Sequence, residues 1–321
     1  MWLRARPSSL RARSGWSTED ESSHIPVLLE EVMGLLGVRE GGAYIDCTVG
    51  LGGHFSELAV RAGESGTAIG LDLDSAALEI TSRRLEKLSR DRALAHWQLV
   101  NASYLSVGEQ ARLLPDGLAD GILFDFGCSS LQLDDPTRGF SFRFDGPLDM
   151  RFDPQGGGRT AADVINTFDA QELADIFYNY GEERRSRAVA RRIVETRARG
   201  PILTTTKLRE VVESVTGRRS GGISGGTRVF QALRIFVNNE LGNVEEALLE
   251  AFECLKQGGV MASITFHSLE DRIVKSYFKN IAVVGRAEIL TKKPVTAKAD
   301  ELKRNPRSRS ARLRAIRKGA L

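Results

Sequence analysis

The sequence predicts an α/β protein with a doubly wound, Rossmann-like parallel sheet and a helical subdomain inserted after the fourth strand. Three observations support this prediction. Short apolar runs alternate with segments of helical periodicity between residues 43 and 127. A glycine-rich turn follows the first run, in "YIDCTVGLGGHF" at 44–55. From residue 136 the alternation stops, and an apolar run of strand type returns only at 260–266.

The elements follow from local patterns. Strands are predicted at 43–47, 66–74, 96–104, 120–127 and 260–266. Helices are predicted at 54–62, 75–88, throughout 161–215 and from about 228 to 255. Ser75 is the expected N-cap of the second helix, and "KQGG" after Leu255 is the expected glycine C-cap of the last. Residues 216–226, "TGRRSGGISGG", indicate a flexible loop.

These elements predict three parts of the chain. Residues 22–135 and 227–321 form the core, and residues 136–226 form the inserted subdomain, which we expect to bind the substrate. Residues 1–21 are expected to be a transit peptide or disordered. The first eighteen residues hold four arginines and no acid, which is typical of a mitochondrial transit peptide. Pro7 weakens a helix there, and a disordered start of a bacterial protein is the alternative.

Composition excludes several classes of protein. No run approaches the eighteen apolar residues of a membrane span, so no membrane partner is expected. Cys47, Cys128 and Cys254 form no C-x-x-C pair, which argues against a structural metal site or a disulfide framework. Residues 303–318 carry eight Lys or Arg and no acid, and a second basic cluster covers 184–199. These clusters favour a polyanionic partner, with a solvated helix face and a frayed tail as the alternative.

The glycine turn predicts a cofactor site. Gly50, Gly52 and Gly53 follow a predicted strand, and Asp72 lies 22 residues after Gly50, where a carboxylate can accept the hydroxyls of a ribose. A dinucleotide fingerprint requires a further glycine, where this chain has Phe55. S-adenosylmethionine (SAM) has no phosphate and needs only the tight turn, so SAM is favoured over a dinucleotide. An ordinary βα turn is the alternative.

Longer segments resemble one family. They are "HIPVLLEEV" (24–32), "DCTVGLGGH" (46–54), "DGILFDFGCSSLQLDDPTRGFSFRFDGPLDMRFD" (120–153), "YGEERRSRAVARRIV" (180–194), "TRVFQALRIFVNNEL" (227–241), "FHSLEDRIVK" (266–275) and "NPRSRSARLRA" (305–315). In this order they resemble the small-subunit ribosomal RNA N4-cytosine methyltransferases, the MraW or RsmH family. The resemblance implies a SAM-dependent methyltransferase sheet. "GCSS", "RIFVNNEL" and the arginine-rich start resemble the mitochondrial members more than the bacterial ones. Ser224, Gly225 and Gly226 depart from the family pattern before Thr227.

The resemblance also implies the cofactor contacts. Gly52, Gly53 and His54 match its G-G-H triplet, and Asp72 matches its ribose-binding acid. Tyr104 corresponds to an aromatic residue of the family that lies near the adenine. Asp125 and Gln132 correspond to the acid and the glutamine of its D-x-G-x-S-S-x-Q motif.

The chemistry of N4 methylation points to Asp125. An acceptor near the amine stabilises its growing positive charge and takes its proton, and we expect Asp125 to do this. The alternative is that Asp125 only binds the amino group of SAM. Cys128 is expected to pack rather than to attack the ring. His54 is expected to contact the cofactor, and His267 to support the turn after the fifth strand.

The expected partner is small-subunit ribosomal RNA or the assembling small ribosomal subunit, in the mitochondrial matrix or, alternatively, the bacterial cytoplasm. The predicted phosphate-binding surface consists of Arg184, Arg187, Arg191, Arg307, Arg309, Arg312 and Arg314. About six neutralised phosphates give a log affinity against log salt slope of roughly −4 to −5. Phe140, Phe142 and Phe144 can stack bases, or at least two of them can form a core between the domains. A non-catalytic SAM- or RNA-binding assembly factor and a nucleotide-dependent dehydrogenase are the rival functions.

Overall fold

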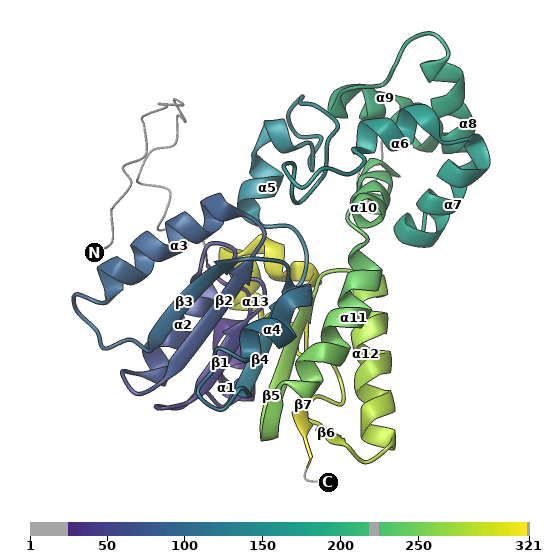
Figure 1. The fold of residues 1–321 in the computed structure, drawn as a ribbon. Helices are drawn as coiled ribbons and strands as arrows, with labels where there is room; N and C mark the ends of the chain where they lie inside the picture. The colour runs from purple at the N-terminus through teal and green to yellow at the C-terminus, as the bar shows by residue number, and fades with distance from the viewer. Residues whose placement is uncertain (1–24, 218–224, 320–321) are drawn as a thin grey trace.

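A computed structural model of the protein describes residues 25–217 and 225–319. These residues form a seven-stranded sheet of order β3-β2-β1-β4-β5-β7-β6 (Figure 1). The strands are β1 Ala43–Asp46, β2 Thr67–Asp72, β3 His96–Asn101, β4 Ala119–Asp125, β5 Leu255–Thr265, β6 Ala287–Ile289 and β7 Arg312–Lys318. The first five strands pair in parallel, and β7 runs antiparallel to both β5 and β6. Because β1 lies between β2 and β4 and runs parallel to both, the carboxyl ends of these three strands meet at one edge.

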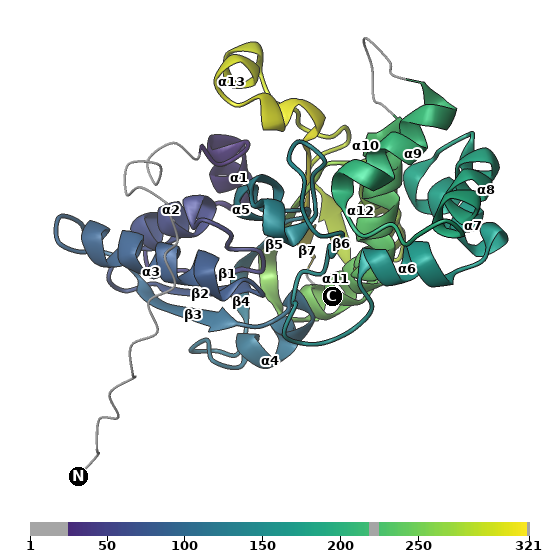
Figure 2. The same cartoon turned by 90° about the horizontal axis from the view of Figure 1, so that it is seen from above.

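Helices cover both faces of the sheet, as a doubly wound fold requires. On one face lie α1 Leu29–Leu36, α2 Gly53–Ala62 and α3 Ser75–Leu88, and on the other lie α4 Val107–Ala111, α11 Glu240–Glu253 and α12 Ser268–Val283. Each face has its own apolar core, formed with the strands. The chain also has a short helix α13, Ala299–Arg304, which protrudes from the rest of the molecule in Figure 2. None of the helices in the described ranges has the length and apolarity that crossing a bilayer requires.

A third core belongs to a helical subdomain beside the sheet. It is built from α6 Ala161–Thr167, α7 Ala170–Gly181, α8 Ser186–Arg197, α9 Thr205–Thr216 and α10 Gly225–Val237. The subdomain stands to one side of the sheet in both views and joins it through α10 (Figures 1 and 2). The packing of Val229, Phe230 and Leu233 in this third core favours a subdomain that ends after Val237 rather than at residue 226. The transit-peptide prediction for 1–21 falls on residues that are not described, as does most of the predicted 216–226 loop.

Several boundaries differ from the sequence-based prediction. The helix predicted from 228 to 255 is two helices, because Asn239 adopts a left-handed conformation (φ 47°) between α10 and α11. The predicted C-cap "KQGG" lies inside β5, where the pairing with β4 shifts register after Ala119. Asp74, not Ser75, caps α3, since its carboxylate accepts the N–H groups of Ala76 and Ala77. The continuous helical pattern at 161–215 is four helices joined by short loops.

Strands β6 and β7 were not predicted. The basic segment 303–318, expected as a solvated tail or a phosphate surface, contributes β7, which lies in the sheet between β5 and β6. Leu313 and Ala315 pack into the core on one face, and Ile316 packs on the other. The charged residues between them obscured this apolar pattern.

Candidate active site

The glycine bend lies directly after β1. Gly52 has φ 73°, and a Cβ there would lie 2.5 Å from Cγ2 of Thr81, so both backbone conformation and packing require glycine. Gly53 begins α2 against Pro26, whose Cβ lies 2.9 Å from where a Gly53 Cβ would be. Gly50 also has a positive φ, but a Cβ there would meet nothing within 4 Å. The open side of the bend is therefore at Gly50, while Gly52 and Gly53 shape it.

Asp72 ends β2 and faces this bend. Its Oδ2 accepts the Gly50 N–H at 2.7 Å, and its Oδ1 accepts the Asp74 N–H at 2.8 Å. Each carboxylate oxygen keeps a second lone pair, which suits the two hydroxyls of a ribose. Burial raises the pKa of Asp72, while the two backbone donors oppose that rise. The orientation is the one that the prediction of a ribose-binding acid requires.

Two further acids lie at the same edge, and each has one buried carboxylate oxygen that no hydrogen-bond donor reaches in the described structure. Asp46 ends β1; its Oδ1 accepts the Thr48 N–H at 3.0 Å, and its buried Oδ2 has no hydrogen-bond partner in the described structure. Oδ1 of Asp125, at the end of β4, is equally buried and without such a partner. Burial raises the pKa of Asp46 to about 7. Burial and the nearby carboxylates of Asp46 and Glu270 raise that of Asp125 well above its ordinary value.

Sequence reasoning did not select Asp46 as a site residue. The available signal was its position as the polar end of an apolar run one strand away from Asp72 and Asp125. Parallel neighbouring strands bring such residues to one edge. A bound cation would meet Asp46 and Asp125 there and would relieve the cost of burying their charge.

His54 is oriented by the backbone. Its Nε2 lies 2.9 Å from the Val27 carbonyl oxygen, so Nε2 carries the proton and donates it. Nδ1 then faces Oδ2 of Asp125 at 3.7 Å. In the neutral ring Nδ1 is an acceptor, and a proton held by Asp125 can be directed toward it. His54 is 5% exposed, so it lies behind Asp125 rather than on the solvent side.

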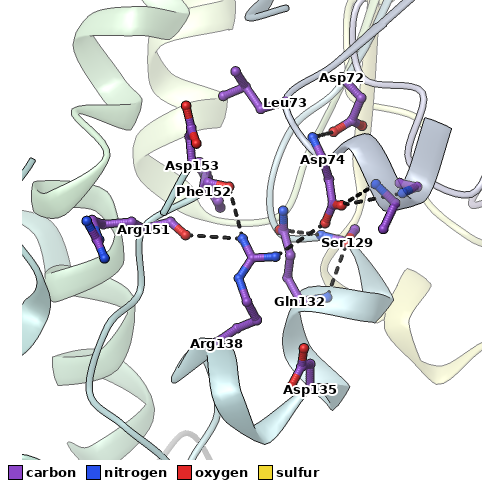
Figure 3. A network of polar contacts seen from close by, with 12 residues as sticks. Asp72, Leu73, Asp74, Ser129, Gln132, Asp135, Arg138, Arg151, Phe152 and Asp153 are labelled. Atoms are coloured by element: carbon purple, nitrogen blue, oxygen red, sulfur yellow. Dashed lines mark hydrogen bonds and ion pairs between the residues drawn. The ribbon is translucent and has the colours of Figure 1, made fainter. Parts of the chain in front are cut away.

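Tyr104 and Gln132 occupy different surroundings. Tyr104 packs edge-on against Phe124 and Phe126 and lines a cleft of about 210 Å³ together with Leu73, the residue after Asp72. This arrangement is compatible with the predicted place beside an adenine. Gln132 is buried, and its Oε1 accepts the Ser129 N–H at 3.1 Å as part of the capping box of α5, Ser130–Asp134 (Figure 3). Its contact with a cofactor stays a prediction.

A buried polar cluster lies between the core and the helical subdomain. Arg234 on α10 binds Glu240 on α11 through two hydrogen bonds of 2.7 and 2.8 Å, and its Nη2 lies 3.8 Å from Oε1 of Glu270. His267 caps α12, which confirms its predicted structural role. Glu240, His267 and Glu270 could together ligate a metal by distance alone. The cation among these acids is the guanidinium of Arg234, so we assign no metal there.

Cys128 touches the same cluster. The Arg234 Nη1–H donates to its Sγ at 3.3 Å. Burial, opposed by Arg234, raises the pKa of the thiol to about 12. A thiol with this pKa is not a thiolate at neutral pH, in line with the prediction that Cys128 packs rather than attacks.

The predicted phosphate-binding arginines divide into three groups. Arg184, Arg187, Arg191 and Arg309 are exposed and have no carboxylate partner in the described ranges. Arg307 and Arg312 are partly exposed and pair with Asp134 and Asp271 at 2.7 and 3.2 Å. The prediction is wrong for Arg314, which is 7% exposed. Its guanidinium binds both oxygens of Asp271 because β7 turns it into the interior.

Two of the three phenylalanines predicted either to stack bases or to form a core pack into a core. Phe140 is buried and stacks on Phe152, and Phe142 packs edge-on against Phe230 of α10. Both contribute to the core of the helical subdomain. Phe144 is 56% exposed and is the one of the three that can reach a base.

The fold and this edge define a class. The open side of the bend, the ribose-type acid Asp72 and the unpartnered oxygens of Asp46 and Asp125 fit a cofactor with an adenosine and a cationic end. With a Rossmann-like sheet whose β7 is reversed, these features are those of a SAM-dependent methyltransferase. Within that class the chain belongs to the MraW methylase family, whose sequence model matches residues 21–319.

Two curated relatives agree with the family assignment. The chain is 46% identical over 300 residues to the ribosomal RNA small subunit methyltransferase H of Acidobacterium capsulatum, covering 93% of this chain and 99% of the relative. It is 47% identical over 300 residues to the protein of the same name from Koribacter versatilis, covering 92% and 94%. Among solved structures, an rRNA methylase from Streptococcus thermophilus aligns with a TM-score of 0.39 at 11% identity, covering 89% and 92%.

Proposed function

We propose that this chain transfers a methyl group from SAM to the exocyclic N4 of a cytidine in small-subunit ribosomal RNA. The observation that carries the proposal is the pair of acids Asp46 and Asp125, each with a buried oxygen that lacks a donor at the cofactor edge. The names of the curated relatives, methyltransferases of small-subunit ribosomal RNA, support the substrate. The choice of N4 rests on the family resemblance of the "DFGCSSLQ" segment.

Each acid at this edge has a proposed role that follows from its position. Asp72 would hold the ribose, and Asp46 would hold the cationic amino-acid end. SAM, when bound, supplies an electrophilic methyl group on a sulfonium sulfur. Asp125 would accept a hydrogen bond from the N4 amino group and then its proton, which leaves the methylated amine neutral. His54 would direct that proton, because its Nδ1 faces Oδ2 of Asp125.

The raised pKa of Asp125 suits this task. Burial raises the pKa of Asp125 well above its ordinary value, so this carboxylate holds an accepted proton more strongly than an exposed one would. A cationic cofactor beside Asp125 would favour the ionised carboxylate, which is the form that can accept the N4 proton.

RNA would approach over the surfaces that carry the exposed arginines. Arg184, Arg187 and Arg191 come from the start of α8 and the turn before it, and Arg309 lies before β7. With four unpaired cations rather than six, the salt slope for single-stranded RNA is about −3. Arg307 and Arg312 would contribute less to RNA binding, because each already pairs with a carboxylate, that of Asp134 or Asp271.

The compartment has two supported alternatives. The arginine-rich residues 1–18 favour the mitochondrial matrix, whereas the bacterial relatives favour a bacterial cytoplasm. A fusion of residues 1–21 to a fluorescent protein, offered to isolated mitochondria, separates them. Import with cleavage supports the matrix, and no import supports the cytoplasm.

The test of the function uses purified protein, labelled SAM and small-subunit RNA. We expect the wild-type protein to transfer label, and Asp125→Asn to lose transfer by at least a hundredfold while it still folds. Binding of S-adenosylhomocysteine, measured in parallel, separates the two roles of Asp125. Retained binding with lost transfer supports a proton acceptor, and equal loss of both supports a role in cofactor binding alone. No transfer by the wild-type protein on naked RNA and on immature subunits would support the rival assembly-factor function.

A further inference from the structure

The cleft beside Tyr104 is built from two parts of the molecule. The core contributes Leu73, Ser103 and Tyr104, next to the ribose-type acid Asp72. The opposite wall is the 151–159 loop, which belongs to the segment leading into the helical subdomain. The junction of α10 and α11 closes one end with Asn238. A cofactor that extends from Asp72 toward Tyr104 would therefore lie between the core and this loop.

The loop is held by hydrogen bonds to its backbone. Arg138 donates from Nη2 to the carbonyl oxygens of Arg151 and Phe152 at 3.2 and 2.9 Å. Asn238 accepts the Phe152 N–H at 2.8 Å and donates to the Met150 carbonyl oxygen at 2.8 Å. Phe152 is thus fixed at both its N–H and its carbonyl group.

Arg138 also reaches the core. Its Nη1 lies 3.4 Å from Oδ2 of Asp74, while Oδ1 of Asp74 caps α3. The Asp74 N–H in turn donates to Asp72, which accepts the Gly50 N–H. Figure 3 shows this connection from Asp72 through Asp74 and Arg138 to the carbonyl groups of the loop. The Arg138 side chain is 19% exposed, and its guanidinium carbon lies 5.7 Å from the centre of the Phe140 ring.

We propose that the 151–159 loop forms the outer wall of the adenosine subsite, and that Arg138 is the positioning residue that holds this wall against Asp74. The helical subdomain then takes part in cofactor binding as well as in substrate binding. Loss of Arg138 frees the loop from the core, so the adenosine end loses its outer wall and the cofactor dissociates faster. The inference depends on SAM as the cofactor and not on the RNA substrate, so its test contains no RNA.

The test measures binding of two probes by calorimetry. S-adenosylhomocysteine has both ends of the cofactor, and 5′-methylthioadenosine has only the adenosine end. We expect Arg138→Gln to weaken both by a similar factor of roughly ten or more, since bonds to a charged donor are lost. Arg143→Gln is the matched control, because Arg143 lies in the same segment, its side chain is 73% exposed, and among the described residues it makes one ion pair, of 3.9 Å with Asp134. It should leave both affinities within about twofold.

Limited trypsin digestion gives a readout independent of affinity. S-adenosylhomocysteine should slow cleavage after Arg151 and Arg159 in the wild-type protein, and this protection should be lost in Arg138→Gln. Unchanged affinities for both probes in Arg138→Gln would overturn the proposal. Weakened binding of S-adenosylhomocysteine alone would also overturn it, because that result would locate the effect at the amino-acid end.

A milder variant covers the case in which Arg138→Gln does not fold. Asp74→Asn keeps an N-cap for α3, since Asn and Asp cap equally well, but removes the charge that faces Arg138. We expect Asp74→Asn to weaken the binding of 5′-methylthioadenosine by roughly threefold to tenfold. An affinity equal to that of the wild-type protein would count against the role of Arg138.

Discussion

Replacing Asp46 by Asn should make the free protein more stable and its cofactor binding weaker. Asp46 is 1% exposed, and its pKa lies at about 7 against an ordinary value of 3.8. Between pH 3.8 and about pH 7 the folded protein holds a proton on Asp46 that the unfolded chain has released, so the free energy of unfolding falls as the pH rises. At about 1.4 kcal/mol per pH unit, the full difference corresponds to about 4 kcal/mol above pH 8. Asn keeps the acceptor for the Thr48 N–H and removes the titration.

The assay is urea unfolding of the cofactor-free protein at pH 5 and pH 8, followed by circular dichroism. The stability gain of Asp46→Asn over the wild-type protein should be larger at pH 8 than at pH 5 by about 2–3 kcal/mol. Calorimetry at pH 8 should show binding of S-adenosylhomocysteine weakened at least tenfold in the same variant. Asp91→Asn is the control, since Asp91 is exposed and its side chain makes no hydrogen bond in the described structure. A gain that is the same at both pH values, or unchanged binding, would refute the reasoning about this carboxyl group.

Four further outcomes follow from the site. Binding of S-adenosylhomocysteine to the wild-type protein should strengthen from pH 6 to pH 8, because its cationic amino group binds the ionised form of Asp46, whose pKa is about 7. Calorimetry across this pH range measures the affinity, and an affinity that does not change with pH would contradict this prediction. Cys128→Ala should keep methyl transfer within about threefold, since a thiol with a pKa of about 12 is no nucleophile, and complete loss in a folded variant would indicate covalent catalysis. Arg234→Met should destabilise the fold by about 3–5 kcal/mol in urea unfolding, because Glu240 would stay buried without its cation, and a variant as stable as the wild type would show that the pair is not needed. Arg187→Gln with Arg191→Gln should make the salt slope of RNA binding shallower by about 1.4, measured by filter binding, whereas an unchanged slope would exclude α8 from the interface.

The central part of the fold could be predicted because its patterns are local. The runs at 43–47, 66–74 and 120–127 are apolar enough to identify buried parallel strands, and the glycine bend follows the first of them. Asp72 was identified by its distance from the glycines, and the structure directs its carboxylate at the bend. These features depend on neighbouring residues, so sequence periodicity was sufficient.

The rest depended on contacts between distant segments. Strand β7 alternates arginines with apolar residues, and only its pairing with β5 and the ion pair of Arg314 with Asp271 show that it is internal. The break between α10 and α11 depends on the left-handed Asn239, which also fits a helical pattern. Asp46 was missed because its one signal, a polar residue at the end of an apolar run, becomes informative only when β1 is placed between the strands that carry Asp72 and Asp125. The wall formed by the 151–159 loop depends on Arg138 reaching Asp74, 64 residues earlier in the chain.

The most direct test of the central claim is mass spectrometry of the nucleosides from small-subunit RNA methylated by the purified protein. We expect N4-methylcytidine with the wild-type protein and none with Asp125→Asn, because Asp125 is the proposed acceptor of the N4 proton. A methyl group on carbon 5 of cytosine or on a ribose oxygen, or the same yield from Asp125→Asn, would contradict the account.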